Sequence, residues 1–167
     1  MQTVLVEPAT RTDVDRMIGA LPHAPAAQHH IRARWDIQQS GEGVYLVARR
    51  DGEIVGQTVL LRHSKYAEVR ADADPAEINA LHAYVQRQGI GTAIIRTAEE
   101  IAAHEWNRPA IGLGVGLDND PARIRYERLG YEPWSGPRVI DHWTEQDADG
   151  TVVRTHSDPC DYLLKYL

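Results

Sequence analysis

Two glycines stand one residue apart at the predicted start of a helix, in the stretch QRQGIGTAII at residues 86–95. A glycine inside a helix costs about 1 kcal/mol relative to alanine, so this pair indicates that bare backbone is needed there. A strand-like run precedes the stretch and an apolar helical run follows it. Such a turn leaves backbone N–H groups uncovered at the positive end of the helix dipole. The pattern therefore predicts a cradle for a phosphate or pyrophosphate, with a simple tight turn as the alternative.

Two better-known phosphate-binding motifs do not occur in the sequence. No Lys-Ser or Lys-Thr follows the glycines, which excludes a P-loop, and the spacing is not the G-x-G-x-x-G of a dinucleotide-binding fold. A second glycine-rich stretch, AIGLGVGL at residues 110–117, stands ahead of Asp-Asn-Asp-Pro, whose carboxylates would repel a pyrophosphate. We therefore interpret residues 110–117 as a buried strand, with glycines where a neighbouring group approaches closely.

Composition and charge restrict the class of protein. The 167 residues fit one domain, residues 1–167, which is long enough to bury a substantial core. A net charge of -6 argues against nucleic-acid binding, and no apolar run approaches the roughly 20 residues that span a bilayer. The one cysteine, Cys160, can form no internal disulfide, and no signal peptide is evident, so we expect a cytoplasmic protein. His23, His29 and His30 lack partners at metal-ligand spacing and predict a solvated helix face, and Cys160 predicts a small buried residue.

Short-range patterns predict a mixed sheet with helices packed on it, an α/β or α+β fold. A strand at residues 3–7 precedes a helix capped by Thr12, and a second helix is predicted at residues 26–39. VYLVARR and EIVGQTVLLR flank Asp51-Gly52, a strong signal for an antiparallel hairpin. The later predicted elements are a polar loop at residues 63–75, a strand at residues 77–85, the helix after the glycine turn, a strand at residues 110–117, a helix from Asn119 or Asp120 to Gly130, a hairpin around residues 147–150 and a separate strand near residues 162–167.

Two motifs follow one another in a fixed order along the second half of the chain. The glycine turn has Gln86, Gly89 and Gly91 in the pattern Q-x-x-G-x-G. The later motif has an asparagine, a small residue, a tyrosine, then leucine, glycine and an aromatic residue, which here are Asn119, Ala122, Tyr126, Leu129, Gly130 and Tyr131. Together they resemble the two signatures of the GNAT superfamily of acyl-CoA-dependent N-acetyltransferases, and the resemblance covers residues 44–167.

The resemblance implies a fold and a co-substrate. The expected fold is a GNAT-like central mixed, mostly antiparallel sheet with splayed strands 4 and 5, flanked by about four helices. In the family, the glycine turn binds the pyrophosphate of acetyl-CoA, and pantetheine pairs with the exposed edge of the strand before it. The implied binding residues are Leu81, His82, Ala83, Gln86, Arg87, Gln88, Gly89, Ile90, Gly91, Thr92, Asn119, Ala122 and Tyr126, with no metal. This chain has fewer residues between that strand and the turn than many members.

Acetylation of an amine calls for a base and an acid. An alkyl amine titrates near 10.4, so at pH 7 fewer than about one molecule in 10³ is a free nucleophile. Glu77 and His82 lie on the strand that the resemblance puts beside the thioester and are both candidate bases; a solvated strand start and a packed histidine are the alternatives. Tyr126 matches the family tyrosine that protonates the leaving thiolate, and a core aromatic is its alternative.

The first functional hypothesis is an N-acetyltransferase that moves an acetyl group from acetyl-CoA to a primary amine of a small molecule or peptide, by direct attack in a ternary complex. The alternatives are a non-catalytic acyl-CoA-binding sensor or scaffold domain, and a nucleotide-binding module of another fold. The acidic residues Glu68, Asp72, Asp74 and Glu77 predict either a solvated loop or the border of an acceptor pocket for a cationic amine. No nucleic-acid or membrane partner is expected, and a homodimer, common among relatives, is left open.

Overall fold

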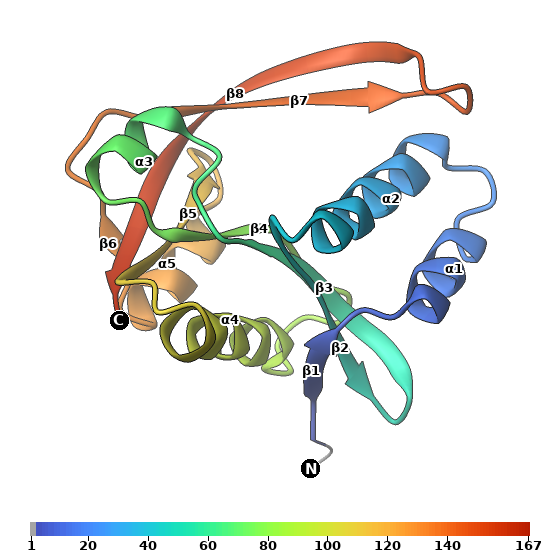
Figure 1. Cartoon of the computed structure of the whole chain (residues 1–167), viewed down its shortest axis with the longest axis horizontal. Helices are drawn as coiled ribbons and strands as arrows, with labels where there is room; N and C mark the ends of the chain where they lie inside the picture. Colours follow the sequence, from blue (N-terminus) through green and yellow to red (C-terminus); the bar gives the residue numbers. More distant parts are fainter. Residues whose placement is uncertain (1–2) are drawn as a thin grey trace.

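A curved eight-stranded sheet runs through the molecule, with helices on both faces (Figure 1). The computed structural model describes residues 3–167. The strands are β1 (Leu5–Pro8), β2 (Gly43–Arg50), β3 (Glu53–Leu61), β4 (Ala76–Ala83), β5 (Ala110–Gly116), β6 (Glu132–Pro133), β7 (Val139–Gln146) and β8 (Val152–Tyr166). They lie in the order β1-β2-β3-β4-β5-β8-β6, with β7 paired to β8. Among these pairs, only β4 and β5 are parallel.

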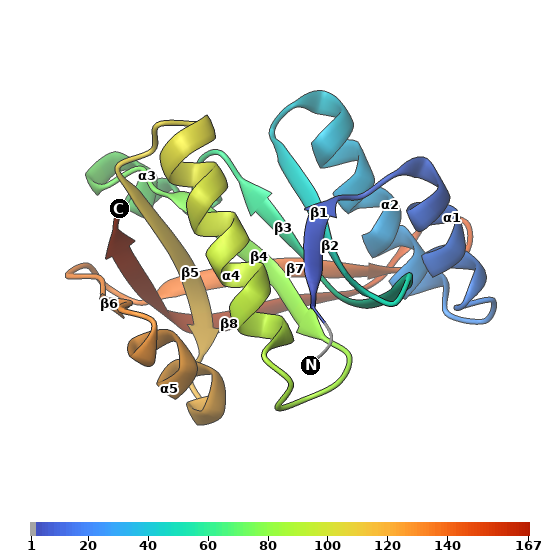
Figure 2. The same ribbon diagram turned by 90° about the horizontal axis from the view of Figure 1, so that it is seen from below.

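The helices divide between the two faces of the sheet. They are α1 (Arg11–Gly19), α2 (Pro25–Ser40), α3 (Ala67–Asp72), α4 (Ile90–Glu100) and α5 (Asp120–Arg128), and a π-helical turn, η1 (Ile101–Glu105), extends α4. Figures 1 and 2 show α1 and α2 on one face and α4 and α5 on the other. No helix within residues 3–167 is long and apolar enough to cross a membrane.

The predicted fold class is confirmed, with five α-helices where about four were expected. The sheet is mixed and mostly antiparallel, and its fourth and fifth strands splay apart. The hairpin of β2 and β3 turns at Asp51 and Gly52, whose φ angles of 54° and 77° are those that this tight turn requires.

Strand β2, between β1 and β3, is buried on both faces, which accounts for its nearly unbroken apolar sequence. Tyr45 and Val47 pack against α1 and α2, while Leu46 and Ala48 pack on the α4 side, and all four side chains are fully buried. Two core layers therefore share one strand, and the two helical layers are held at fixed positions relative to each other.

Three predictions about individual elements were wrong. Residues 63–75 contain the short helix α3, which buries only Val69 and is too short to show a periodic pattern. The cap of α1 is Thr10: its hydroxyl accepts from the Asp13 N–H (3.2 Å), and the Asp13 carboxylate accepts from the Thr10 N–H (2.8 Å). The predicted tail hairpin forms between β7 and β8, but its second strand and the predicted last strand are one strand, β8, which exchanges β7 for β5 as its partner at Cys160 without a turn.

An ion pair fastens α1 to the sheet. Arg49 of β2 donates to Glu7 of β1 at 2.8 Å and to both carboxylate oxygens of Asp13 at the start of α1. Asp13 is 3% exposed, and its hydrogen bonds with Arg49 lower the pKa of its carboxyl to about 2. The connection between β1 and α1 is therefore held by a nearly buried charge pair.

Candidate active site

β4 and β5 pair only at their first residues and then diverge (Figure 2). Their register joins Ala76 to Ile111 and Glu77 to Gly112. Beyond Glu77, β4 continues to Ala83 with no strand partner on that side among the described residues. Backbone N–H and C=O groups along this edge of β4 therefore have no strand partner there and can pair with an extended ligand, although the Ala83 carbonyl accepts from the Gln86 side-chain amide at 2.9 Å.

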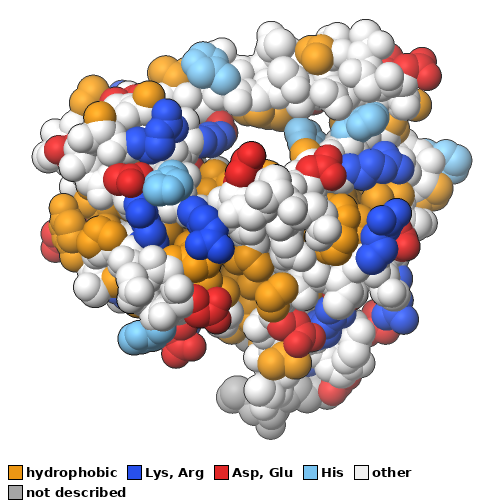
Figure 3. All heavy atoms as spheres, viewed as in Figure 1, with side chains coloured by type: hydrophobic (Ala, Val, Ile, Leu, Met, Phe, Trp, Pro, Cys, Tyr) orange, Lys and Arg blue, Asp and Glu red, His pale blue; other side chains and the backbone are white. Residues whose placement is uncertain are grey.

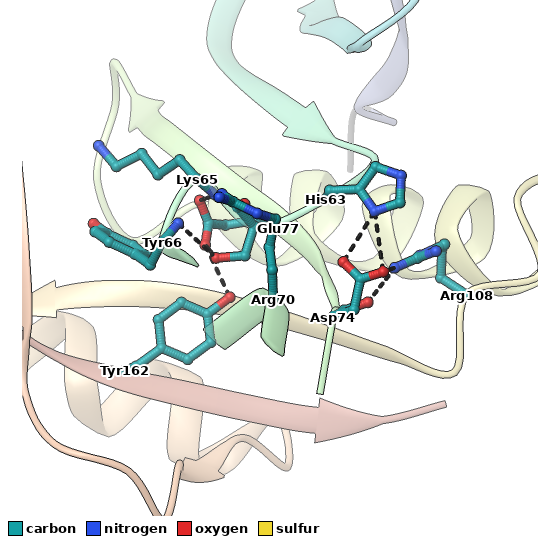
Figure 4. Close-up of polar contacts among 9 residues, drawn as sticks. His63, Lys65, Tyr66, Arg70, Asp74, Glu77, Arg108 and Tyr162 are labelled. Carbon is teal, nitrogen blue, oxygen red and sulfur yellow. Dashed lines mark hydrogen bonds and ion pairs between the residues drawn. The ribbon is translucent and has the colours of Figure 1, made fainter. Parts of the chain in front are cut away.

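Glu77 lies at the vertex of this opening and is fully buried (Figure 4). One carboxylate oxygen accepts from the Ser64 hydroxyl (2.5 Å) and the Tyr162 hydroxyl (2.9 Å). The other accepts from the Lys65 N–H (3.1 Å) and the Asn79 amide (2.8 Å). Glu77 therefore ties the loop after β3, strand β4 and strand β8 together where the sheet begins to open.

The glycines of β5 make room for two tyrosines, as the interpretation of residues 110–117 as a close-packed strand required. A Cβ on Gly112 would overlap the Tyr162 hydroxyl, and one on Gly114 would lie 3.1 Å from the Tyr66 hydroxyl. The two rings meet edge to face at 5.8 Å. Both glycines thus serve packing beside the vertex.

β4 carries a bulge halfway along its length. Thr58 of β3 stands opposite both Ala80 and Leu81, because the register of the two strands shifts there. Ala80 has φ 54°, a left-handed conformation that strains a residue with a Cβ. Leu81 then packs into the core on the α4 side, while His82 faces a cavity on the other side. The bulge thus decides which side of the sheet receives the imidazole.

That cavity has a volume of about 900 Å³ and lies between α1, α2, the strands β3 and β4, and the arm formed by β7 and β8. Figure 3 shows the surface hollowed beneath this arm. Met17 of α1, Leu21 in the connection between the two helices and Ile31 of α2 contribute an apolar wall. Trp143 of β7 lines the side formed by the arm. The cavity opens beside the free half of β4, so a ligand on that edge and a ligand in the cavity would meet at His82.

A polar network crosses the floor of the cavity. Arg34 of α2 donates to the Gln57 side-chain oxygen at 2.9 Å, and the Tyr45 hydroxyl donates to the same oxygen. The Gln57 amide nitrogen donates to the Tyr84 hydroxyl. Desolvation in the cavity and then the charge of Arg34 lower the pKa of His82, so its imidazole is neutral at neutral pH and able to accept a proton.

The glycine turn begins α4 with its first backbone amides open. Gly89 is the N-cap residue with φ 73°, and Arg87 before it has φ 62°. Within the described chain no side chain caps this helix start, so its first N–H groups lack the partner that a cap would supply. An ideal Cβ on Gly91 would lie 3.0 Å from a guanidinium nitrogen of Arg125, which therefore lies against the bare backbone. On the other side of the turn, Arg50 donates to Gln88.

The later motif forms the start and the middle of α5. Asn119 is the N-cap residue, and its side-chain oxygen accepts from the Ala122 N–H at 3.4 Å. Tyr126 is 9% exposed and packs edge to face with Tyr131 at 6.1 Å, within the core that includes β5. Burial raises the pKa of the Tyr126 hydroxyl, which therefore keeps its proton at neutral pH. Tyr126 does not line the 900 Å³ cavity.

Comparison with known proteins identifies the family. The acetyltransferase (GNAT) family pattern matches residues 14–131. The chain belongs to the GNAT acetyltransferase family. A search of curated proteins finds no significant match to this chain.

Solved structures of low sequence identity share the fold of this chain. A ribosomal-protein-alanine N-acetyltransferase from Brucella melitensis has a TM-score of 0.64 at 18% identity, covering 98% of this chain and 99% of its own. A variant spermidine N-acetyltransferase from Vibrio cholerae has a TM-score of 0.67 at 11% identity, with 98% and 93% covered. The protein yncA of Salmonella typhimurium, solved with its cofactor acetyl-CoA, has a TM-score of 0.64 at 13% identity, with 98% and 94% covered.

The acidic residues between Glu68 and Glu77 lie away from the cavity. Asp72 accepts from the Trp134 indole at 2.7 Å, and Asp74 pairs with His63 and Arg108, each at 2.9 Å (Figure 4). None of Glu68, Asp72, Asp74 and Glu77 lines the cavity. The expectation that these carboxylates border an acceptor pocket is therefore not met at this cavity. Asp72, Asp74 and Glu77 instead bind neighbouring loops and strands, and Glu68 is exposed.

Sequence reasoning missed most of the cavity. Arg34, Gln57 and Tyr84 come from three elements and form no local motif, so only the fold brings them together. His30, predicted on a solvated helix face, is half-buried and lines the cavity, with its ring 6.2 Å from that of Trp143 on the β7–β8 arm.

Among residues 3–167, no cluster of histidine, cysteine and carboxylate side chains is arranged to hold a metal ion. Cys160 is buried, as predicted.

Proposed function

We propose that the protein is an N-acetyltransferase that transfers an acetyl group from acetyl-CoA to a primary amine of a small molecule or peptide, by direct attack in a ternary complex. One observation carries the proposal: the free edge of β4 leads from the open glycine turn to a cavity in which His82 is neutral. The family supports acetyl transfer as the reaction.

The donor would bind along the glycine turn and the edge of β4. Open amides at a helix start, in a turn made of residues 86–92, suit a pyrophosphate. Arg125 and Arg50 flank the same turn and add positive charge. The free half of β4, at Leu81, His82 and Ala83, would pair with the pantetheine arm. Asn119 and Ala122 would contribute by fixing the start of α5, the helix that carries Arg125.

The acetyl thioester supplies the activated acyl group, and this chain supplies the proton transfers. His82 would accept the proton that the attacking amine loses, because its imidazole faces the cavity in the neutral form. Tyr126 would donate its proton to the departing sulfur, since its raised pKa keeps the hydroxyl protonated until then. As the new amide forms and the C–S bond breaks, the products are the acetylated amine and CoA with a free thiol.

Of the two predicted bases, we propose His82 for proton transfer. The oxygens of Glu77 accept four hydrogen bonds at the vertex, and Glu77 does not line the cavity. We propose that Glu77 is a positioning residue, which holds β4 and β8 where the opening begins.

The experiment that tests this function follows thiol release from acetyl-CoA with a panel of small amines and short peptides. We expect amine-dependent thiol release in the wild type and a loss of at least about tenfold in kcat for Tyr126→Phe, while CoA still raises the melting temperature of both. Stabilisation by CoA without turnover on the whole panel would instead identify a sensor domain. Absence of any stabilisation by CoA would contradict both.

A further inference from the structure

The half-buried arginines of the chain fall into two groups. In the first group each guanidinium pairs with a carboxylate: Arg49 with Asp13, Arg108 with Asp74, and Arg123 with Asp161. In the second group, Arg34, Arg50 and Arg125, no carboxylate within the described residues lies within ion-pair distance. Arg50 and Arg125 flank the turn proposed to bind phosphates. Of these three arginines, Arg34 is the one that lines the cavity.

Arg34 is held in place by neutral groups. Among residues 3–167, its one side-chain hydrogen bond is to the Gln57 amide oxygen at 2.9 Å, and that amide is fixed in turn by the hydroxyls of Tyr45 and Tyr84. A guanidinium has five N–H donors in a planar fork, so most of its donors remain available to a ligand. The network therefore orients a cation without neutralising it.

The carboxylates that line the cavity do not offset Arg34. Asp141 is already paired with Lys65, which closes the gap between β7 and the loop after β3. Glu53 is exposed at the start of β3, and so is Arg16 on α1. The remaining unbalanced charge in the cavity is therefore positive, and a polyamine would bring further positive charge beside it.

We propose that the acceptor carries, besides its reactive amine, an anionic group, a carboxylate or a phosphate, that binds Arg34. This inference rests on the acetyl transfer proposed above. Gln57, the partner of Arg34, stands directly opposite His82 in the β3–β4 ladder. The anion and the amine of the acceptor therefore lie a few bonds apart, as they do in an amino acid or a short aminoalkyl phosphate. A guanidinium and such an anion form charge-assisted, often bidentate hydrogen bonds.

The test compares matched pairs of amines that differ only in the anion. One pair is a short amino acid and the primary amine without the carboxylate; the other is an aminoalkyl phosphate and its amino alcohol. Thiol release from acetyl-CoA gives kcat and KM. Calorimetric titration of the same compounds into the protein saturated with CoA gives affinity without turnover. The two pairs distinguish a carboxylate from a phosphate.

In the wild type we expect the anionic member of one pair to be favoured at least about tenfold in kcat/KM and in affinity. Arg34→Gln removes this preference mainly through KM. Arg32→Gln, on the exposed side of the same helix, keeps it. Preference of the wild type for the members that lack the anion, or for a polyamine, overturns the inference and leaves acetyl transfer standing. The inference is also overturned if Arg34→Gln changes kcat/KM equally for both members of a pair. It is overturned as well if the wild type neither binds nor acetylates the members that carry the anion. Binding through Arg34 without thiol release supports the anion site and contradicts the transferase.

Discussion

At the scale of single residues, the chemistry of the site depends on the positive charge of Arg34 and on the imidazole of His82, whose pKa that charge helps to lower. Arg34 from α2 affects the pKa values of His30, Tyr45, His82 and Tyr84, and none of these residues is a sequence neighbour of Arg34 except His30. Desolvation is the larger cause of the lowered pKa of His82, and the positive charge of Arg34, which disfavours a second one, adds to it in keeping His82 in the neutral form that accepts a proton. The same charge attracts an anion, so one side chain would serve both the base and the acceptor.

We predict that Arg34→Gln raises the pKa of His82 toward 6.5, because the variant removes a cation that opposes protonation while desolvation in the cavity remains. The groups that face His82 across the cavity floor, Gln57 and Tyr84, are uncharged at neutral pH and stay in place. Histidine NMR titrations of the wild type and the variant measure the shift. An unchanged or lower pKa of His82 in the variant would show that Arg34 does not act on it.

At the scale of elements, the bulge in β4 determines which side chains reach the cavity. Without the extra residue, strict alternation would turn His82 and Leu81 to the opposite faces. The sequence does not reveal this bulge, because its left-handed residue is Ala80 and not a glycine. The apolar pattern therefore predicted that β4 is a strand. It could not predict on which face of the sheet the side chains of its second half lie.

The strain at Ala80 predicts opposite effects of two substitutions. Ala80→Val lowers the free energy of unfolding by about 1–2 kcal/mol, because a β-branched residue is poorly tolerated at positive φ. Ala80→Gly leaves it unchanged or raises it by up to about 1 kcal/mol, since glycine adopts this conformation without strain. Urea denaturation of the two variants checks both values. Equal stability of both variants would argue against a left-handed residue at this position.

The ion pair between α1 and β2 predicts how stability responds to acid. The pKa of Asp13 falls from 3.8 to about 2 on folding, which corresponds to roughly 2 kcal/mol of stability. A lowered folded-state pKa makes this contribution complete above about pH 4 and lost as the pH falls through 2. Asp13→Asn should therefore destabilise the protein by roughly that amount at pH 7, and the difference from the wild type should vanish near pH 2. A difference that does not depend on pH, measured by denaturant unfolding, would assign the loss to packing.

At the scale of the whole molecule, the sequence predicts one half of the site and not the other. The donor half depends on local patterns: the turn with Gly89 and Gly91, and the motif from Asn119 to Tyr131, each lie within one stretch of chain, so the fold and acetyl-CoA could be predicted from them. The acceptor half is built where α1, α2, β3, β4 and the β7–β8 arm converge. Arg34 and Gln57 are 23 residues apart, and no short pattern records their contact.

The central claim is that this chain moves an acetyl group onto an amine with His82 as the base. The most direct measurement is the transfer of an isotopically labelled acetyl group from acetyl-CoA to an amine, followed by mass spectrometry of the product. We expect labelled amide from the wild type and from His104→Gln, a control on η1 outside the 900 Å³ cavity, and about 10² times less from His82→Gln at neutral pH. Equal labelling by all three proteins would contradict the role of His82, and no labelled amide from the wild type with any amine would contradict the account as a whole.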